Sequence, residues 1–317
     1  MFRYKLRGVE VREQAPPGPV ATPAPDPRTV VEWTLLVPSR LRSFTVARSR
    51  ASAVHGLPLE LVDELVELGL PVQLTGGEPH LDAMDLDTAA LQLGHPSIQR
   101  RAMRHWAQTL ERAQALPVAR YRLEYTPRAT GRTAPGPEAR ALVAPGTWTG
   151  WPRTDQPLAC RAECATRWPE PPAAARTVAA RIGELRFFMV PPPLRDDPGF
   201  ARETRLAGCS VAGELVLDEC RAAGIECRRA FGLLLSMPYS IEHVWAELRA
   251  GDAWVPFDPH LLGTLASHAG LDPRCWPPTR SPGAVLARLG DRRGPVAERG
   301  GEPLEVTVIT RLEEADG

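Results

Sequence analysis

The spacing of hydrophobic residues in the first half of the chain predicts several short elements. Leu57–Leu68 carries apolar residues three and four positions apart, which is typical of a helix, and a glycine suited to ending a helix follows it. Ser97–Ala115 predicts a second helix, with its serine at the capping position. Thr29–Val37 is rich in β-branched residues and Val118–Tyr125 alternates between apolar and polar positions, so we expect both to be strands.

The second half of the chain mixes the two periodicities. Three helices are expected, over Ala174–Phe187, over a segment that starts at Cys209 and runs to Gly224, and over Ala284–Leu289. The strand patterns lie at Ala139–Val143, Cys227–Leu235, Ile241–Arg249, Trp254–Asp258 and Leu304–Arg311.

Proline-rich stretches divide the chain into three parts. Residues 1–28 are expected to form a short strand followed by a Pro-rich linker, and residues 29–170 an accessory region of mixed α/β structure. Prolines cluster again around residue 170, just before the predicted helix at Ala174, so residues 171–317 are expected to form the last domain. The chain has 34 prolines in 317 residues, about twice the usual share, which favours long loops over long helices.

Charge and hydropathy exclude two classes of partner. The chain has 38 basic and 38 acidic residues, and this zero net charge lacks the positive excess that nucleic-acid binding requires. No run of about 18 apolar residues and no apolar leader core is present, so we expect neither a membrane-spanning segment nor a secretory signal, and a cytoplasmic location. In such a compartment the six cysteines are expected to be free thiols.

Cys209 is the first residue with a specific chemical interpretation. It directly follows Gly208 at the start of a predicted helix. The first-turn N–H groups of a helix lack backbone acceptors and stabilise negative charge, so a cysteine there is favoured as a thiolate, which is the reactive form. The same N–H groups can hold the oxyanion of a tetrahedral intermediate. The alternative is that Cys209 is a small buried apolar residue, as most free cysteines are.

A predicted hairpin supplies the partners that a catalytic thiol needs. If Gly251 and Asp252 form a two-residue loop, paired residue numbers sum to 503, and His243 is the diagonal neighbour of Asp258 on one face. A four-residue loop puts the two directly opposite each other, whereas a three-residue loop without a bulge separates them onto opposite faces. In the first two cases the carboxylate orients the imidazole, and the imidazole stabilises a thiolate and protonates a leaving group.

These motifs resemble those of the transglutaminase-like superfamily, in the form of its compact bacterial members. The matching motifs are Gly208-Cys209, Ala223-Gly224-Ile225 with Arg228 and Phe231-Gly232, His243-Val244-Trp245-Ala246-Glu247, and Trp254-Val255-Pro256-Phe257-Asp258-Pro259. The resemblance implies an α+β, papain-like catalytic domain, in which a helix bearing the cysteine packs on an antiparallel sheet bearing the histidine and the aspartate. It also implies a catalytic set of Cys209, His243 and Asp258, with acyl transfer through a thioester on Cys209.

The rest of the site follows from the same resemblance. The backbone N–H of Cys209 is the expected oxyanion donor. A second donor in the family is often an upstream Gln, Trp or Tyr, and no such residue occurs between positions 172 and 208. Trp245 and Trp254 are expected to wall the cleft or fill the core, and they are our candidate substrate contacts. Animal transglutaminases carry an aromatic residue after the cysteine, but Ser210 stands there in this chain, which weakens a strict protein cross-linking assignment.

Three functions remain open at this point. The first is a cysteine acyltransferase or hydrolase that acts on a peptide, protein or acyl-thioester substrate, with an amine or water as acceptor. The second is an amide synthase for carrier-bound acyl thioesters, and the third is a catalytically silent peptide- or carrier-binding module. The sequence carries no metal-ligand, phosphate-loop or dinucleotide motif, so we expect no metal and no cofactor. His260 is a minor competitor for the role of base, and Glu242 and Glu247 are expected to be solvated.

Overall fold

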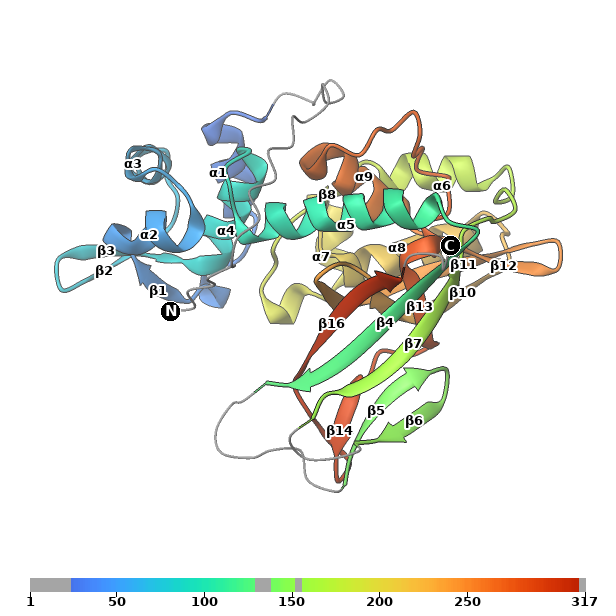
Figure 1. Cartoon of the computed structure of the whole chain (residues 1–317). Coiled ribbons are helices and arrows are strands. Elements are labelled where there is room, and N and C mark those ends of the chain that lie inside the picture. The colour runs from blue at the N-terminus through green and yellow to red at the C-terminus, as the bar shows by residue number, and fades with distance from the viewer. Residues whose placement is uncertain (1–23, 129–137, 152–155, 314–317) are drawn as a thin grey trace.

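The computed structural model of the chain describes residues 24–128, 138–151 and 156–313 (Figure 1). The strand expected within residues 1–13 lies outside the described residues. In Figure 1 a small unit that includes α1 to α4 lies to one side, and the long helix α5 (Ile98–Gln114) connects it to the body of the molecule. The structure mixes helices with antiparallel strands, which confirms the expected α+β class.

The first unit has its own hydrophobic core. It contains α1 (Pro27–Leu35), β1 (Phe44–Ala47), α2 (Arg48–His55), α3 (Leu59–Glu67), β2 (Val72–Thr75), β3 (Glu78–Asp82) and α4 (Ala83–Gln92), with the sheet order β1-β3-β2. Buried residues from Val30 to Ala90 form this core, separately from the core under the large sheet. The helices predicted at Leu57–Leu68 and Ser97–Ala115 are confirmed as α3 and α5, and the Ser97 side chain caps α5 by accepting from the Arg100 N–H.

The strand predicted at Thr29–Val37 is wrong, because this segment is the helix α1. Asp26 caps the helix by accepting a hydrogen bond from the Thr29 N–H at 2.9 Å, and Pro27 occupies the first turn, where its missing N–H costs nothing. Val30, Val31 and Thr34 are buried at helical spacing. Capping and burial against α3 and α4 therefore outweigh the strand preference of the β-branched residues.

The body of the molecule is built on a seven-stranded antiparallel sheet. Its order is β13-β10-β11-β16-β4-β7, and β12 pairs with β11. The strands are β4 (Val118–Pro127), β7 (Leu158–Ala165), β10 (Cys227–Leu234), β11 (Tyr239–Ala250), β12 (Ala253–Phe257), β13 (Leu286–Gly290) and β16 (Val306–Glu313). A smaller sheet of β5 (Ala139–Ala144), β6 (Thr147–Gly150), β14 (Ala297–Arg299) and β15 (Glu302–Pro303) lies beside it.

Strands from both sides of residue 170 pair in this one sheet. β4 and β7 come from the predicted accessory region, and β16, near the end of the described chain, joins β4 to β11. The buried residues beneath the sheet likewise come from both parts of the chain. The proposed division of the chain at residues 28 and 170 stays a prediction, and the sheet continues across the second of these positions.

Three predicted elements in the second half differ from the structure. The helix expected over Ala174–Phe187 is α6 (Ala175–Ile182), which stops before Gly183 and is followed by the short strand β8 (Arg186–Phe187). Ala284–Leu289 is a 3-10 turn followed by the edge strand β13, because its residues pair with β10 and not with one another. The strand expected over Trp254–Asp258 ends at Phe257, and Asp258 caps the helix α9 (Pro259–Ala269), which we did not predict.

A close backbone approach requires glycine at position 232, in the middle of β10. A Cβ atom added there would lie 2.0 Å from the carbonyl oxygen of Ala287 in β13. We therefore expect Gly232→Ala to lower the free energy of unfolding by about 1–3 kcal/mol, measured by urea denaturation. Gly263→Ala is the matched control, because a Cβ in that position of α9 meets nothing within 4 Å. It should leave stability unchanged or slightly raised; equal losses in the two variants would contradict the steric argument.

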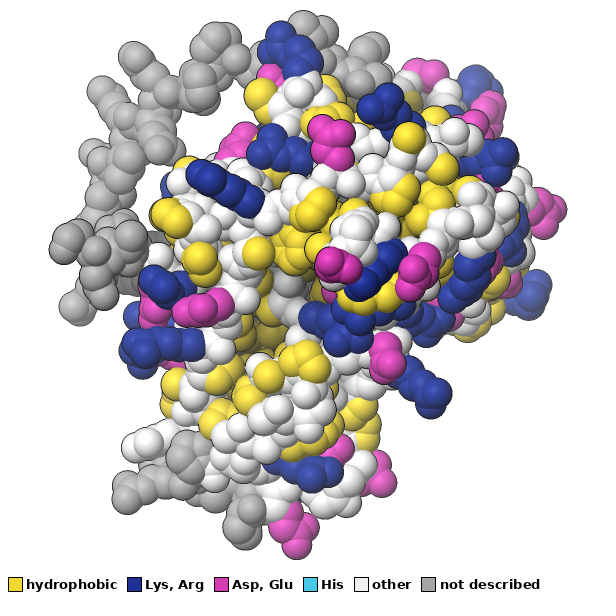
Figure 2. All heavy atoms as spheres, turned by 90° about the vertical axis from the view of Figure 1, so that its right-hand side faces the viewer, with side chains coloured by type: hydrophobic (Ala, Val, Ile, Leu, Met, Phe, Trp, Pro, Cys, Tyr) yellow, Lys and Arg dark blue, Asp and Glu magenta, His cyan; other side chains and the backbone are white. Residues whose placement is uncertain are grey.

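The surface shows charges of both signs. On the face drawn in Figure 2, basic and acidic side chains lie among one another over the upper part of the molecule. Within the described ranges, no helix is both long and apolar enough to cross a bilayer.

Candidate active site

Cys209 is the first residue of α8 (Cys209–Ala222), as the sequence predicts. The two-residue strand β9 (Leu206–Ala207) pairs in parallel with β8 and leads into the helix, and Gly208 takes the N-cap position. No side chain of the described residues caps the helix, so its first-turn N–H groups lack a side-chain acceptor. Cys209 itself is partly exposed, whereas the apolar side of the helix, including Leu215 and Cys220, is buried.

The helix lies directly on the strand that carries the histidine. A Cβ atom added to Gly213, one turn into α8, would be 3.0 Å from the carbonyl oxygen of Val244 in β11. The helix and the strand therefore approach each other more closely than an alanine would allow without adjustment. This contact holds the N-terminus of α8 near the middle of β11, where His243 lies.

The hairpin of β11 and β12 has a two-residue loop, which is one of the loop lengths that place His243 and Asp258 on the same face. Ala250 pairs with Ala253 and Ala246 with Phe257, so the paired residue numbers sum to 503. Asp258 directly follows β12 and serves as the N-cap of α9, with one carboxylate oxygen, Oδ1, accepting from the Leu261 N–H at 2.9 Å. The other oxygen, Oδ2, is 2.6 Å from Nε2 of His243. The helix start and the strand end thus fix the carboxylate beside the imidazole.

His243 is held between a carboxylate and a thiol. Its side chain is 1% exposed, and that of Asp258 is 7% exposed. Burial alone lowers the pKa of His243, but the hydrogen bond with Asp258 and the interaction with Cys209 outweigh it and raise the pKa from 6.5 to about 10. The remaining ring nitrogen, Nδ1, is buried without a well-formed hydrogen bond, so it is the atom free to exchange a proton with the sulfur.

The two tryptophans lie at different ends of the hairpin. Trp245 is 1% exposed and lies beside the imidazole of His243, with ring centroids 6.2 Å apart and planes at 16°. Trp254 lies near the turn, with the guanidinium groups of Arg228 and Arg249 over its ring at 4.3 and 5.5 Å. The structure therefore brings Trp245 to the imidazole but not Trp254, and substrate contact by either residue stays a prediction.

Two further titratable residues near the site, Glu247 and His260, are both buried. Glu247 is 5% exposed and accepts from Arg228 at 2.6 Å, so the expectation that it is solvated is wrong. A carboxylate in this buried strand position is stable because it is paired. His260 is 4% exposed in the first turn of α9, and the carboxylate oxygens of Asp258 are already taken by His243 and by the Leu261 N–H. His260 is therefore not the partner of that carboxylate.

The environments of the six cysteines differ in a way that labelling can detect. Burial raises the pKa of Cys220 and Cys164 to about 12 and that of Cys160 to about 11, whereas Cys275 is exposed. We expect iodoacetamide at neutral pH to label Cys209 about tenfold faster than Cys275, and the buried thiols last, measured by mass spectrometry of peptides. Labelling of Cys209 no faster than Cys275 would mean that its thiolate is not activated.

Among the described residues, no group of three or more His, Cys, Asp or Glu side chains could hold a metal ion.

The match to a known protein family covers the part of the chain that contains Cys209, His243 and Asp258. Residues 170–259 match the family model of the transglutaminase-like superfamily. A candidate cysteine protease from Cytophaga hutchinsonii, known from its crystal structure, is 17% identical with a TM-score of 0.30, over 45% of this chain and 46% of that one. The search of curated proteins found no match. Residues 170–259, which bear Cys209, His243 and Asp258, are thus similar to the transglutaminase-like superfamily.

Proposed function

We propose that this protein is a cysteine acyltransferase or amide hydrolase in which Cys209, His243 and Asp258 act together. The observation that supports this most strongly is the buried His243–Asp258 hydrogen bond of 2.6 Å beside a partly exposed cysteine at a helix N-terminus. A merely structural cysteine needs neither an ionised neighbour nor an open helix end. The arrangement instead supplies a nucleophile, a proton carrier and a group that orients the proton carrier.

The chemistry proceeds in two halves. The Cys209 thiolate attacks the acyl carbon, a sulfur–carbon bond forms, and the developing oxyanion is held by the first-turn N–H groups of α8. The bond to the leaving group breaks as His243 gives that group its proton from Nδ1. An amine or water then attacks the thioester, His243 accepts a proton from it, and the acyl product leaves as the thiolate is restored.

An amide synthase, a transglutaminase and a hydrolase differ in the acyl donor and the acceptor that they use, so an assay with different donors and acceptors distinguishes them. The protein should be incubated with an acyl thioester plus an amine, with casein plus an amine, and with each donor in water alone. Amide formed from the thioester would indicate an amide synthase, amine incorporated into casein a transglutaminase, and release of the free acid a hydrolase. Access of water to the thioester decides between transfer and hydrolysis.

A trapped acyl-enzyme is the direct test of the shared step. After a brief incubation with an acyl thioester and acid quenching, intact-mass and peptide analysis should find one acyl group on Cys209. Cys275→Ala, which removes an exposed thiol elsewhere, should still form the adduct, whereas His243→Ala should form it far more slowly. Absence of any adduct and of turnover with all donors would support the catalytically silent binding module in place of this proposal.

A further inference from the structure

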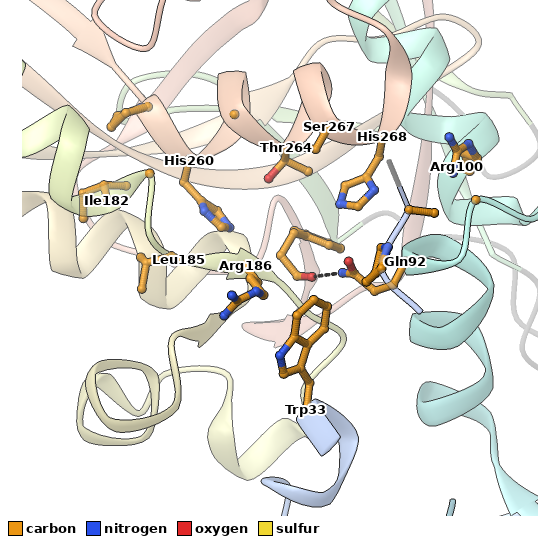
Figure 3. Close-up of a pocket in the computed structure, with 17 residues that line it drawn as sticks. Trp33, Gln92, Arg100, Ile182, Leu185, Arg186, His260, Thr264, Ser267 and His268 are labelled. Carbon is orange, nitrogen blue, oxygen red and sulfur yellow. Dashed lines mark hydrogen bonds between the residues drawn. The ribbon is translucent and has the colours of Figure 1, made fainter. Parts of the chain in front are cut away.

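A cavity of about 540 Å³ lies beside the candidate active site and is lined by parts of the chain that are distant in sequence (Figure 3). Trp33 comes from α1, Gln92 from the last residue of α4, Arg186 from β8, and His260 and His268 from α9. In Figure 3 the two histidines extend from α9, and Trp33 extends from α1, toward the same space. The volume lies in the usual range of small-molecule sites, about 300–1,000 Å³.

Two side chains that line the cavity each have one buried nitrogen without a hydrogen-bond partner among the described residues. His260 is 4% exposed, its ring stacks on Phe187 with centroids 6.2 Å apart, and its Nε2 atom has no hydrogen-bond partner. Arg100 donates from one terminal nitrogen to the Leu91 carbonyl at 3.3 Å, but its buried Nε has no partner. The side chains of Arg100 and His260 thus keep some hydrogen-bonding capacity that the described protein groups around them do not use.

The charged side chains that line the cavity are two arginines, Arg100 and Arg186, and none of its described lining residues is an aspartate or a glutamate. His260 and His268 also line it, but their pKa values are lowered, so near pH 7 their rings are neutral hydrogen-bonding groups. Burial first, and then the charges of Arg100 and His260, lower the pKa of His268 to about 4. The nearby Asp258 carboxylate is already held by His243 and the Leu261 N–H. A negative group in this space would therefore gain several donors and oppose no acid.

Part of the remaining wall is aromatic and aliphatic. The guanidinium of Arg186 lies 4.4 Å from the ring centre of Trp33, and Phe187, Leu185 and Ile182 complete this side. Aromatic and aliphatic walls favour a ligand with an apolar or planar body, while the basic groups favour a charged end.

We propose that this cavity binds a small organic anion, a carboxylate or phosphate carried on an apolar or aromatic body. The site is separate from the proposed chemistry, because Cys209, His243 and Asp258 do not line it. It is nevertheless close to that chemistry, since His260 follows Asp258 by two residues and its ring interacts with the backbone of Ala207, two residues before Cys209. The anion is either a free molecule or the charged end of the acyl substrate.

The first test compares ligands that differ only in charge. Benzoate and benzamide, with inorganic phosphate as a third probe, should be titrated calorimetrically into the full chain at constant ionic strength. Benzoate is expected to bind saturably, and benzamide at least about tenfold more weakly, because it lacks the charge-assisted hydrogen bonds. Equal binding of benzoate and benzamide, or no saturable binding of any probe, would overturn the proposal.

The second test uses variants. The double variant Arg186→Gln/His268→Asn should bind benzoate at least about tenfold more weakly than the unmodified protein. Arg181→Gln is the matched control, because Arg181 is exposed, pairs with Glu219 and does not line the cavity. Unchanged binding in a correctly folded double variant would overturn the proposal. If the double variant does not fold, the comparison of benzoate with benzamide in the unmodified protein decides.

The two sources of the anion give different kinetics, and binding does not depend on catalysis. Cys209→Ala should bind benzoate as the unmodified protein does, so a failure of the catalytic proposal leaves this one testable. Benzoate that competes with a carboxylate-bearing acyl substrate, and not with the matching amide-bearing substrate, would identify the cavity as the site for the substrate's charged end. Binding without competition against either substrate would identify a separate small-molecule site.

Discussion

Replacing Cys209 with alanine should abolish turnover and leave the fold intact. The substitution removes the sulfur at the open N-terminus of α8 beside His243. Loss of a covalent nucleophile lowers kcat by roughly 10⁴-fold or more, because the remaining groups act as a unit with it. The residue is partly exposed and contributes no hydrogen bond that caps the helix, so its loss creates no core cavity.

The measurement pairs activity with thermal unfolding. Cys209→Ala should show background rates with an acyl thioester and a melting temperature within a few degrees of the unmodified protein. Cys275→Ala, at an exposed position far along the chain, should retain full activity. Residual activity of Cys209→Ala at more than about a hundredth of the original rate would mean that the sulfur is not the nucleophile.

The site could be predicted from the sequence because its parts are specified locally. A glycine before Cys209 and the apolar spacing after it define the helix start, and Gly251-Asp252 sets a loop length that fixes the register of the hairpin. Once the register is known, residue numbers alone show that His243 and Asp258 are neighbours on one face. The carboxylate is also an N-cap, so one residue ends the strand, begins α9 and orients the imidazole.

The parts that the sequence did not show depend on contacts between distant segments. α1 is a helix because Asp26 caps it and its valines are buried by other helices, which outweighs their strand preference. The helix α9 was not predicted, although Pro259 at its start is suited to the first turn of a helix. β16 pairs with β4, which lies more than 100 residues earlier in the chain, and with β11, which lies about 70 residues earlier, and no local pattern encodes either pairing.

The cavity beside the candidate active site also could not be predicted from the sequence, because it is formed by distant segments. Its basic residues are spread from Arg100 to His268, and none of them forms a recognisable motif with its neighbours in sequence. The two arginines of the cavity come together only when β8 and the start of α5 are placed around one space, with the histidines of α9 beside them. The overall net charge of zero gives no indication of this local excess.

Replacing Asp258 with asparagine should lower activity most at alkaline pH. The carboxylate holds the pKa of His243 up to about 10, and an amide removes the negative charge that does so. The pKa of His243 should then fall toward or below 6.5, and above that value the ring has no proton to give to a leaving group. We expect kcat/KM to drop roughly tenfold near pH 7 and further at pH 9, a milder loss than that of Cys209→Ala.

The raised pKa of His243 also makes the free energy of unfolding depend on pH. Because the pKa of His243 is higher in the folded protein than in the unfolded chain, its contribution is full below about pH 6.5 and is lost as the pH rises toward 10. The free energy of unfolding, measured by urea denaturation between pH 6 and pH 10, should therefore fall less steeply with pH in Asp258→Asn than in the unmodified protein.

Asp252→Asn is the control for this pH dependence, since Asp252 lies fully exposed in the turn of the same hairpin and away from the imidazole. It should reproduce the original pH–activity profile. A pH-independent loss in Asp258→Asn would assign Asp258 a structural role as the cap of α9, and full activity at every pH would remove it from the catalytic set. A loss that grows with pH, in Asp258→Asn alone, is the result that only a carboxylate acting through the imidazole explains.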